Sequence, residues 1–260
     1  MKRIILGLLF DGESFYLSRN FRLQRLGNLE WLRSNFRIFD LTSFVDEVAV
    51  FHVSRKFDTE QFAGALKDLT QNLFVPLSVG GGVRSVADAD TLFRAGADRV
   101  MFSGTLWTNP GLVRDVTEKY GKQAVLGVLN YSFQGLEGPA VRYRRDGAVV
   151  GENMASLPLA EMAATVGELV VQSIERDGTG QGFPTDQLGL FSELSDLPWV
   201  AAGGFGAPHH VAEALGNGEV RAVLTSNLLA FVGTGLELAR TAASDLGVGL
   251  ARWDQFSAQV

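Results

Sequence analysis

The stretch Ser78-Val-Gly-Gly-Gly-Val-Arg84 returns in altered form as Ala201-Ala-Gly-Gly-Phe-Gly-Ala207. Sliding the first stretch onto the second aligns residues 78–107 with 201–230 without a gap. In this alignment Gly80 meets Gly203 and Gly81 meets Gly204. A chain of 260 residues that repeats itself at about half its length predicts a doubled fold with two matched glycine-rich turns.

Short β-branched apolar runs alternate with longer segments of helical period, which is typical of parallel strands joined by crossover helices. The expected strands are 3–10, 47–53, 76–79, 98–103, 124–130, 168–173, 199–202 and 221–225. Eight strands, each followed by a helix, in about 250 residues match a (β/α)₈ barrel. A doubly wound sheet has the same local signals, but the half-chain repeat favours the barrel. The sequence therefore predicts an α/β fold, a (β/α)₈ TIM barrel with half-barrel duplication.

Helical periodicity and one irregular segment complete the expected organisation. The expected helices are 60–72, 86–95, 110–120, 157–166, 185–194, 208–215 and 228–243. No Pro/Gly/Ser-rich linker divides the chain, so we expect residues 1–260 to form a single domain. The segment 134–152 breaks the alternation, and its Tyr143-Arg-Arg-Asp-Gly147 is typical of a hairpin. We expect this hairpin to be inserted after the fifth strand, on the face where barrel active sites lie.

The composition narrows the class of protein. Hydrophobic residues make up 46% and charged residues 20% of the chain, as in an ordinary globular protein. The net charge of −6 argues against a nucleic-acid-binding surface. Without cysteine, and with three histidines, the chain favours neither a disulfide nor a metal site, and we expect no cofactor. The first apolar run is too short for a signal peptide and none could span a membrane, so we expect a cytoplasmic protein.

The glycine-rich turns are candidate anion cradles. Glycine lets backbone N–H groups approach an anion and adopts the positive φ that an anion-binding nest requires. Each turn has a serine one βα unit later, and Asp177-Gly-Thr-Gly180 follows the strand before the second turn. One glycine run alone is explained equally well by a tight turn, but two matched cradles favour phosphate binding. The expected phosphate-binding residues are Gly81, Gly82, Ser103, Gly104, Gly178, Gly204, Thr225 and Ser226.

Motifs along nearly the whole chain resemble the cyclase (synthase) subunit of imidazole glycerol phosphate synthase, a histidine-biosynthesis barrel that works with a glutaminase. They are Lys2-Arg-Ile-Ile5, Asp46-Glu47, Val79-Gly-Gly-Gly82, Gly96-Ala-Asp-Arg-Val100, Asn109-Pro110 and Ser173-Ile-Glu-Arg-Asp-Gly-Thr179. A sequential isomerase of the same pathway shares the fold and the Arg-Asp-Gly-Thr motif. The first two motifs fit the cyclase better.

The resemblance implies two catalytic aspartates, a general acid and a general base at the ends of the first and fifth strands. This chain has Leu9 and Asn130 there, and an asparagine cannot exchange a proton at neutral pH. The family's supporting acid at the end of the second strand is replaced by His52. Asp11, His52 or Asp177 could take over the acid/base work. The alternative for His52 is a barrel-mouth histidine bonded to a neighbour.

Other positions of the family are retained. The family passes ammonia from its glutaminase through the barrel, past a ring of four alternating charges at the bottom face. This chain has Arg3, Glu47, Arg99 and Glu168 at those positions, and Asp98 where the family contacts its glutaminase. Charges in this layer are costly to bury unless they are paired. The ring is either a structural plug or an ammonia gate, and its retention with Asp98 while both acids are lost favours the gate.

That combination resembles the divergent cyclase-like proteins of bacterial surface-polysaccharide pathways. There a barrel and a glutaminase supply ammonia to a separate ATP-dependent amidotransferase, which converts a sugar acetamido group to an acetamidino group. The segment 17–31 departs from the histidine-pathway loop and carries Arg19, Arg22 and Arg25. It binds a partner or an anion, or it is a solvated loop.

Three functions remain open on the sequence. The leading one is a non-cyclising subunit of a glutamine-dependent amidotransferase assembly that conducts ammonia, with the expected partners a glutaminase, a sugar amidotransferase and a phosphorylated small molecule. The second is an active cyclase or lyase on a bisphosphorylated substrate. The third is a catalytically silent scaffold that binds a phosphorylated ligand. None of the three involves nucleic acid or a membrane.

Overall fold

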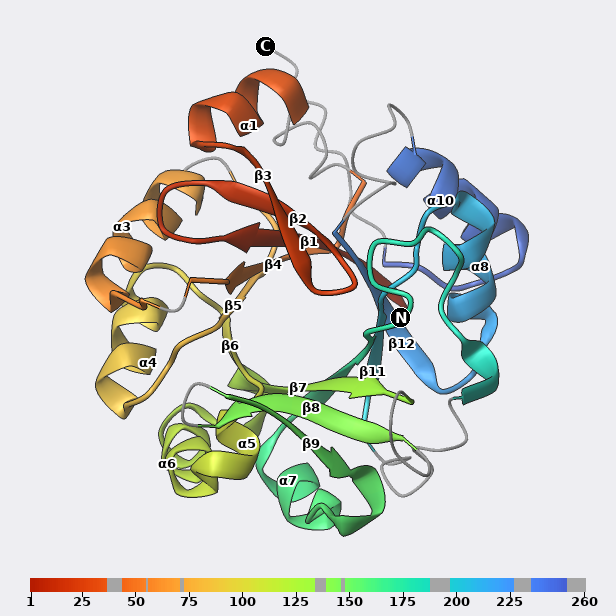
Figure 1. The fold of residues 1–260 in the computed structure, drawn as a ribbon. Helices are drawn as coiled ribbons and strands as arrows, with labels where there is room; N and C mark the ends of the chain where they lie inside the picture. The colour runs from red at the N-terminus through yellow and green to blue at the C-terminus, as the bar shows by residue number, and fades with distance from the viewer. Residues whose placement is uncertain are drawn as a thin grey trace.

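A closed parallel barrel forms the body of the protein. The computed structural model describes residues 1–36, 44–54, 56–70, 73–133, 139–145, 148–187, 197–226 and 235–251, apart from the side chains of residues 36, 144 and 145. The barrel strands are β1 (Arg3–Phe10), β4 (Glu47–His52), β5 (Leu77–Gly80), β6 (Arg99–Phe102), β7 (Val125–Ser132), β10 (Glu168–Ser173), β11 (Trp199–Ala202) and β12 (Val220–Thr225). Strand β12 pairs in parallel with β1 and closes the sheet (Figure 1). The expected (β/α)₈ fold is confirmed.

Helices surround the barrel (Figure 1). They are α1 (Leu29–Phe36), α3 (Thr59–Thr70), α4 (Val86–Arg94), α5 (Thr105–Thr108), α6 (Pro110–Tyr120), α7 (Leu159–Thr165), α8 (Pro208–Gly216) and α10 (Gly235–Asp245), with short 3₁₀ turns at Lys122–Ala124 and Met154–Ser156. Local signals fix their starts: Ser85 and Asp88 form a capping box before α4, and Asn109 caps α6 with Pro110 at its first position. Most of the expected helix 185–194 lies outside the described residues, as does 228–234. No helix in the described part of the chain is long and apolar enough to cross a membrane.

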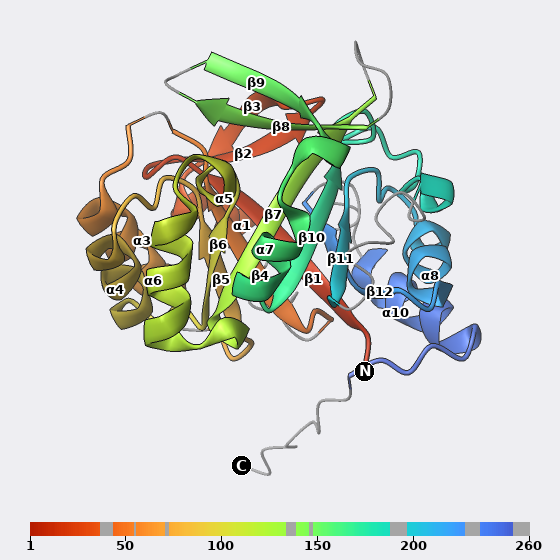
Figure 2. The same ribbon diagram turned by 90° about the horizontal axis from the view of Figure 1, so that it is seen from below.

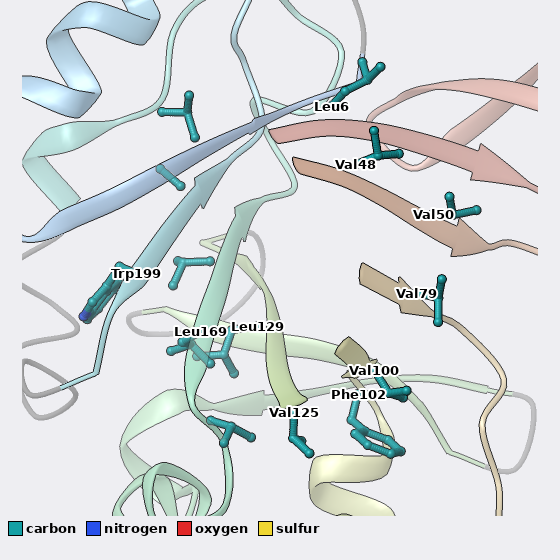
Figure 3. Close-up of a cluster of buried hydrophobic side chains, with 14 of the residues drawn as sticks. Leu6, Val48, Val50, Val79, Val100, Phe102, Val125, Leu129, Leu169 and Trp199 are labelled. Carbon is teal, nitrogen blue, oxygen red and sulfur yellow. The ribbon is translucent and has the colours of Figure 1, made fainter. Parts of the chain in front are cut away.

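Two apolar cores follow from the alternation of side chains along the strands. Residues such as Ile4, Val48 and Val100 point outward and pack against the helices in the larger core. Figure 3 shows part of this layer, including Leu6, Val50, Val79 and Leu129. The barrel interior holds a separate cluster of Ile5, Ala49, Met101, Leu126, Val128, Val170, Val200, Ala202, Ala222 and Leu224. A strand with both faces buried reads as continuously apolar, which is why the sequence suggested a parallel sheet.

Two β-hairpins extend the barrel at the end opposite Met1 (Figure 2). Strands β2 (Phe15–Arg19) and β3 (Arg22–Gly27) are antiparallel, and β2 pairs with β1. Strands β8 (Ala140–Arg145) and β9 (Ala148–Asn153) form the other antiparallel pair, and β8 also pairs antiparallel with the end of β7. The first hairpin and the helices α1 and α5 were not predicted from the sequence, where 17–31 was treated as a loop.

The two halves match, with one correction at the glycine turns. Val79 and Ala201 occupy equivalent places, because Val79 pairs with Val50 and Val100 while Ala201 pairs with Val171 and Val223. The residues with positive φ are Gly81 and Gly82 in one half and Gly203 and Gly204 in the other. The gapless alignment was therefore wrong by one residue at this turn: Gly81, and not Gly80, corresponds to Gly203. Strand β11 reaches its turn one residue sooner than the alignment requires.

Candidate functional site

The four predicted ring residues lie at the first positions of β1, β4, β6 and β10, and the structure brings them together. Arg3 Nη1 is 3.0 Å from Glu47 Oε2, and Arg99 Nη1 is 2.7 Å from Glu168 Oε2. Arg3 also pairs with Glu168, and Arg99 with Glu47. Each arginine thus joins both glutamates in a closed ring of alternating charge. The glutamate side chains are 2% and 7% exposed, whereas that of Arg3 is 25% exposed.

Asp98 immediately precedes β6, next to the ring residue Arg99. Its Oδ2 accepts a hydrogen bond from Leu77 N at 2.8 Å, while the residue itself is exposed. The aspartate therefore holds the start of β5 in place and still presents a carboxylate to solvent at the bottom face.

The positions of the two missing aspartates face the barrel mouth. On β7, Leu126 and Val128 belong to the interior cluster, so the alternation points Asn130 inward as well. On β1 the inward series runs from Arg3 through Ile5 to Leu9 by the same rule. Asn130 Nδ2 donates to Ser103 Oγ at 3.2 Å. The mouth thus carries an apolar side chain and a neutral amide where carboxylates were expected.

Asp11 is occupied within its own turn. Its Oδ1 accepts from the amides of Glu13 and Ser14 at 2.9 and 2.7 Å, and its Oδ2 accepts from Tyr16 Oη at 2.6 Å. Burial acts to raise the pKa of the Asp11 carboxyl, but the hydrogen bonds outweigh it and lower that pKa below its ordinary value. A carboxylate held in its ionised form in this way is a poor general acid.

His52 does not lie at the mouth, contrary to the sequence-based hypothesis. The preceding residue, Phe51, packs against the interior cluster, so His52 points outward toward α3. Its ring contacts the edges of Phe57 and Phe62, with centroids 4.9 and 5.1 Å apart. Burial lowers the pKa of His52, and its Nδ1 has no hydrogen-bond partner in the described structure. The alternation of strand β4 explains the error, because the sequence assignment considered only the strand end.

Asp177 anchors the β2–β3 hairpin. Its Oδ2 accepts from Ser18 Oγ at 2.5 Å and from Phe21 N at 2.9 Å, and its backbone oxygen accepts from Asn20 N. A Cβ on Gly178 would lie 2.1 Å from Ser18 O, so only glycine allows this close approach. Asp177 therefore holds the hairpin over the mouth, a role that the sequence did not suggest.

The first glycine turn packs tightly against β4. Gly81 and Gly82 have φ values of +95° and +86°. A Cβ on Gly81 would lie 2.2 Å from His52 O, and one on Gly82 would lie 2.4 Å from the Phe57 ring. Ser103 and Gly104 follow the adjacent strand β6, with Gly104 at the start of α5. The geometry fits an anion nest and a tight turn equally well, so phosphate binding here stays a prediction.

The second glycine turn borders a hollow at the barrel mouth. Its lining includes Ser18, Asp177, Gly178, Gly204, Thr225 and Ser226. Thr225 is only 2% exposed, yet its Oγ1 has no hydrogen-bond partner in the described part of the chain. A buried hydroxyl without a partner is costly, so this atom is suited to a ligand. The residues of the two cradles follow the ends of barrel strands, and their binding of a ligand stays a prediction.

Three residues of the mouth were missed by sequence reasoning: Tyr16, Ser18 and Gln172. Tyr16 and Ser18 bind the carboxylates of Asp11 and Asp177, and Gln172 Nε2 donates to Asp177 Oδ1 at 3.4 Å. Asn20 could have indicated the turn between β2 and β3, because asparagine adopts the left-handed conformation more readily than most residues. Its φ is +49°. The exposed strand β3 lacks the apolar alternation that reveals a half-buried strand.

The comparison with known proteins agrees with this architecture. The family model described as "Histidine biosynthesis protein" matches residues 44–233. The chain belongs to this family. A protein of Parasynechococcus marenigrum (strain WH8102), named "Putative imidazole glycerol phosphate synthase subunit hisF2", is 36% identical over 259 residues, 98% of this chain and 96% of the relative.

The resemblance to the cyclase subunit is therefore confirmed. The chain is a divergent member of the family, because Leu9 and Asn130 stand where the resemblance implies aspartates. Among the described residues no three His, Cys, Asp or Glu side chains form a group that could hold a metal ion.

Proposed function

We propose that this protein is a non-cyclising barrel subunit of a glutamine-dependent amidotransferase assembly. In this role it receives ammonia from a glutaminase at the bottom face and conducts it through the barrel to the mouth. The observation that carries the proposal is the closed Arg3–Glu47–Arg99–Glu168 ring at one end, combined with a mouth where the candidate acids Asp11 and Asp177 are both hydrogen-bonded within the protein.

The ring has the properties of a gate. Removing one partner of a buried ion pair costs about 3–5 kcal/mol, so an open ring is stable only when something compensates its charges. A docked glutaminase can supply that compensation at Arg3, which is the most exposed of the four side chains. The ring would then open in the assembly and remain closed in the free subunit.

The apolar interior above the ring favours the neutral form of the cargo. An unpaired ammonium ion loses its hydration at a large cost in an apolar environment, whereas neutral ammonia loses far less. Three of the interior residues, Ala49, Ala202 and Ala222, are small. Neighbouring side chains would therefore have to move least beside them to let ammonia pass. This layer would pass ammonia and exclude ammonium.

The glutaminase is proposed on two grounds. The relative from Parasynechococcus marenigrum is named as a synthase subunit, and the resemblance implies a glutaminase partner for that type of subunit. Asp98 also presents an exposed carboxylate beside the ring. We propose that it contacts a basic group of the glutaminase.

The proposed final acceptor is an acetamido sugar of a surface polysaccharide, amidated by a separate ATP-dependent enzyme. This part rests on the lost aspartates, since a cyclase without acid and base groups needs another destination for its ammonia. A phosphorylated small molecule in the second cradle would report on the pathway, and the free hydroxyl of Thr225 supports its binding there. Asp11 and Asp177 are both hydrogen-bonded within the protein, which disfavours a cyclase that uses them.

The experiment pairs the purified chain with the glutaminase encoded nearest to it. We expect the wild-type chain to raise glutaminase activity and, with the amidotransferase and an acetamido sugar nucleotide, to transfer labelled amide nitrogen from glutamine. Arg99→Ala should release ammonia to solvent instead, while Arg99→Lys should retain coupling because it keeps the charge. Arg114→Ala, which changes an exposed arginine of α6, is the matched control.

Two results would contradict the proposal. One is a wild-type chain that cyclises a bisphosphorylated substrate with ammonium salt alone. The other is full coupling in Arg99→Ala, which would reduce the ring to a structural plug. Amidation of a different acceptor would agree with ammonia conduction and would contradict only the proposed sugar acceptor.

A further inference from the structure

We infer that Asn130 and Gln172 form an uncharged binding pair for ammonia at the barrel mouth, which passes neutral ammonia on without retaining ammonium. This inference rests on the proposed conduit and specifies how its exit works.

The two side chains are neighbours on adjacent strands. Gln172 of β10 is in register with Asn130 of β7. Two residues earlier, Val170 and Val128 are also in register, and both belong to the barrel-interior cluster. Because side chains two residues apart share a face of a strand, the amide pair lies directly above the apolar interior. Anything that leaves the interior on this side meets these two amides first.

The amide nitrogens are already used, and the amide oxygens are not. Asn130 Nδ2 donates to Ser103 Oγ, and Gln172 Nε2 donates to Asp177 Oδ1. Asn130 Oδ1 and Gln172 Oε1 accept no hydrogen bond from the residues that the structure describes. A carboxamide oxygen accepts hydrogen bonds from N–H groups. Ammonia has three N–H bonds, so it can donate to both oxygens at once.

The absence of charge decides what the pair does. A carboxylate at either position would form a charge-assisted hydrogen bond with ammonium, roughly twice as strong as a neutral one. An amide neither titrates nor carries charge, so it holds the cation less strongly than a carboxylate would. A weak neutral site lets ammonia leave, which a delivery route requires.

The nearest carboxylate is shielded. Asp177 turns Oδ1 toward Gln172 Nε2, and its Oδ2 is held by Ser18 Oγ at 2.5 Å and Phe21 N at 2.9 Å. Leu9 makes another inward-facing position of the mouth apolar. With Leu9 and Asn130 in place of the two acids, the mouth is suited to releasing ammonia and not to transferring protons.

The first test uses ammonium chloride as the probe and needs no partner. The melting temperature of each protein is compared in ammonium chloride and in potassium chloride at equal ionic strength. We expect no difference for the wild type, and a higher melting temperature in ammonium for Asn130→Asp and for Gln172→Glu, because a ligand bound to the folded state stabilises it. Gln123→Glu makes the same chemical change at an exposed site far from the mouth, and should show no ammonium effect.

The second test measures nitrogen transferred per glutamine hydrolysed in the reconstituted assembly. Asn130→Asp should reduce this ratio roughly fivefold, as expected for charge-assisted retention. Specific stabilisation of the wild type by ammonium, or undiminished coupling in Asn130→Asp, would overturn the inference. A wild-type protein that transfers no nitrogen from glutamine would instead refute the proposed conduit. The comparison of melting temperatures would then still test the amide pair.

Discussion

Replacement of Thr225 by valine tests the second cradle, because it should affect stability and binding in opposite directions. Valine has the shape of threonine without the hydroxyl, and both are β-branched residues suited to strand β12. Thr225 is 2% exposed and its Oγ1 has no hydrogen-bond partner in the described structure. An unsatisfied buried polar group costs about 1–3 kcal/mol. Since Thr225 lines the hollow, the lower figure applies, and Thr225→Val should raise the free energy of unfolding by about 1 kcal/mol.

For a chain of this size the same change raises the melting temperature by about 2–4 °C. Phosphate binding should weaken, because a hydrogen bond to a charged group is worth about 1.5–3 kcal/mol, or roughly 10- to 100-fold in affinity. Urea unfolding without and with inorganic phosphate measures both effects. Thr225→Ser is the control, since it keeps the hydroxyl and should keep the response to phosphate.

A loss of more than about 1 kcal/mol in Thr225→Val without ligand would refute the reasoning. Such a loss would mean that the hydroxyl is already satisfied in the free protein. An unchanged response to phosphate would place the anion elsewhere.

Three further predictions concern the mouth and its supports. Gly81→Ala should destabilise the fold by about 3 kcal/mol, because the residue combines positive φ with a close approach to a backbone oxygen; Gly64→Ala on α3, with open space around it, should instead stabilise by about 0.5–1 kcal/mol in the same urea assay. The pKa of His52, measured by NMR titration, should lie below 6.5, and a pKa above 6.5 would contradict its buried placement. Because the pKa is depressed in the folded state, the contribution of His52 to stability should be present above pH 6.5 and lost as pH falls through the folded pKa. Tyr16→Phe should raise the pKa of Asp11 toward its ordinary 3.8. Asp11 stabilises the fold above that pH, so the free energy of unfolding should fall less in the variant than in the wild type as pH drops below it. An identical fall in both proteins at low pH would show that the tyrosine hydrogen bond is absent in solution.

The sequence by itself determined the barrel and the two ends of its axis. Glu47, Arg99 and Glu168 each open a strand of near-continuous apolar residues, and the first residues of parallel strands meet at one end of a barrel. The roles of the ring, of Leu9 and of Asn130 came from the resemblance to the cyclase subunit, and the strand pattern agrees with where the structure places them. The glycine turns were found from the repeated glycine stretch, and glycine recurs there because positive φ and close backbone approach restrict a position to glycine.

Only the tertiary structure decided how the remaining polar side chains are used. Asp11, His52 and Asp177 all stand near strand ends, and no local pattern distinguishes their roles. The fold directs His52 toward Phe57 and Phe62, closes Asp11 onto Tyr16, and joins Asp177 to Ser18, which is 159 positions distant in the chain. Local sequence signals reach over a few residues, whereas the partner of a buried polar group is set by segments that meet only when the barrel closes.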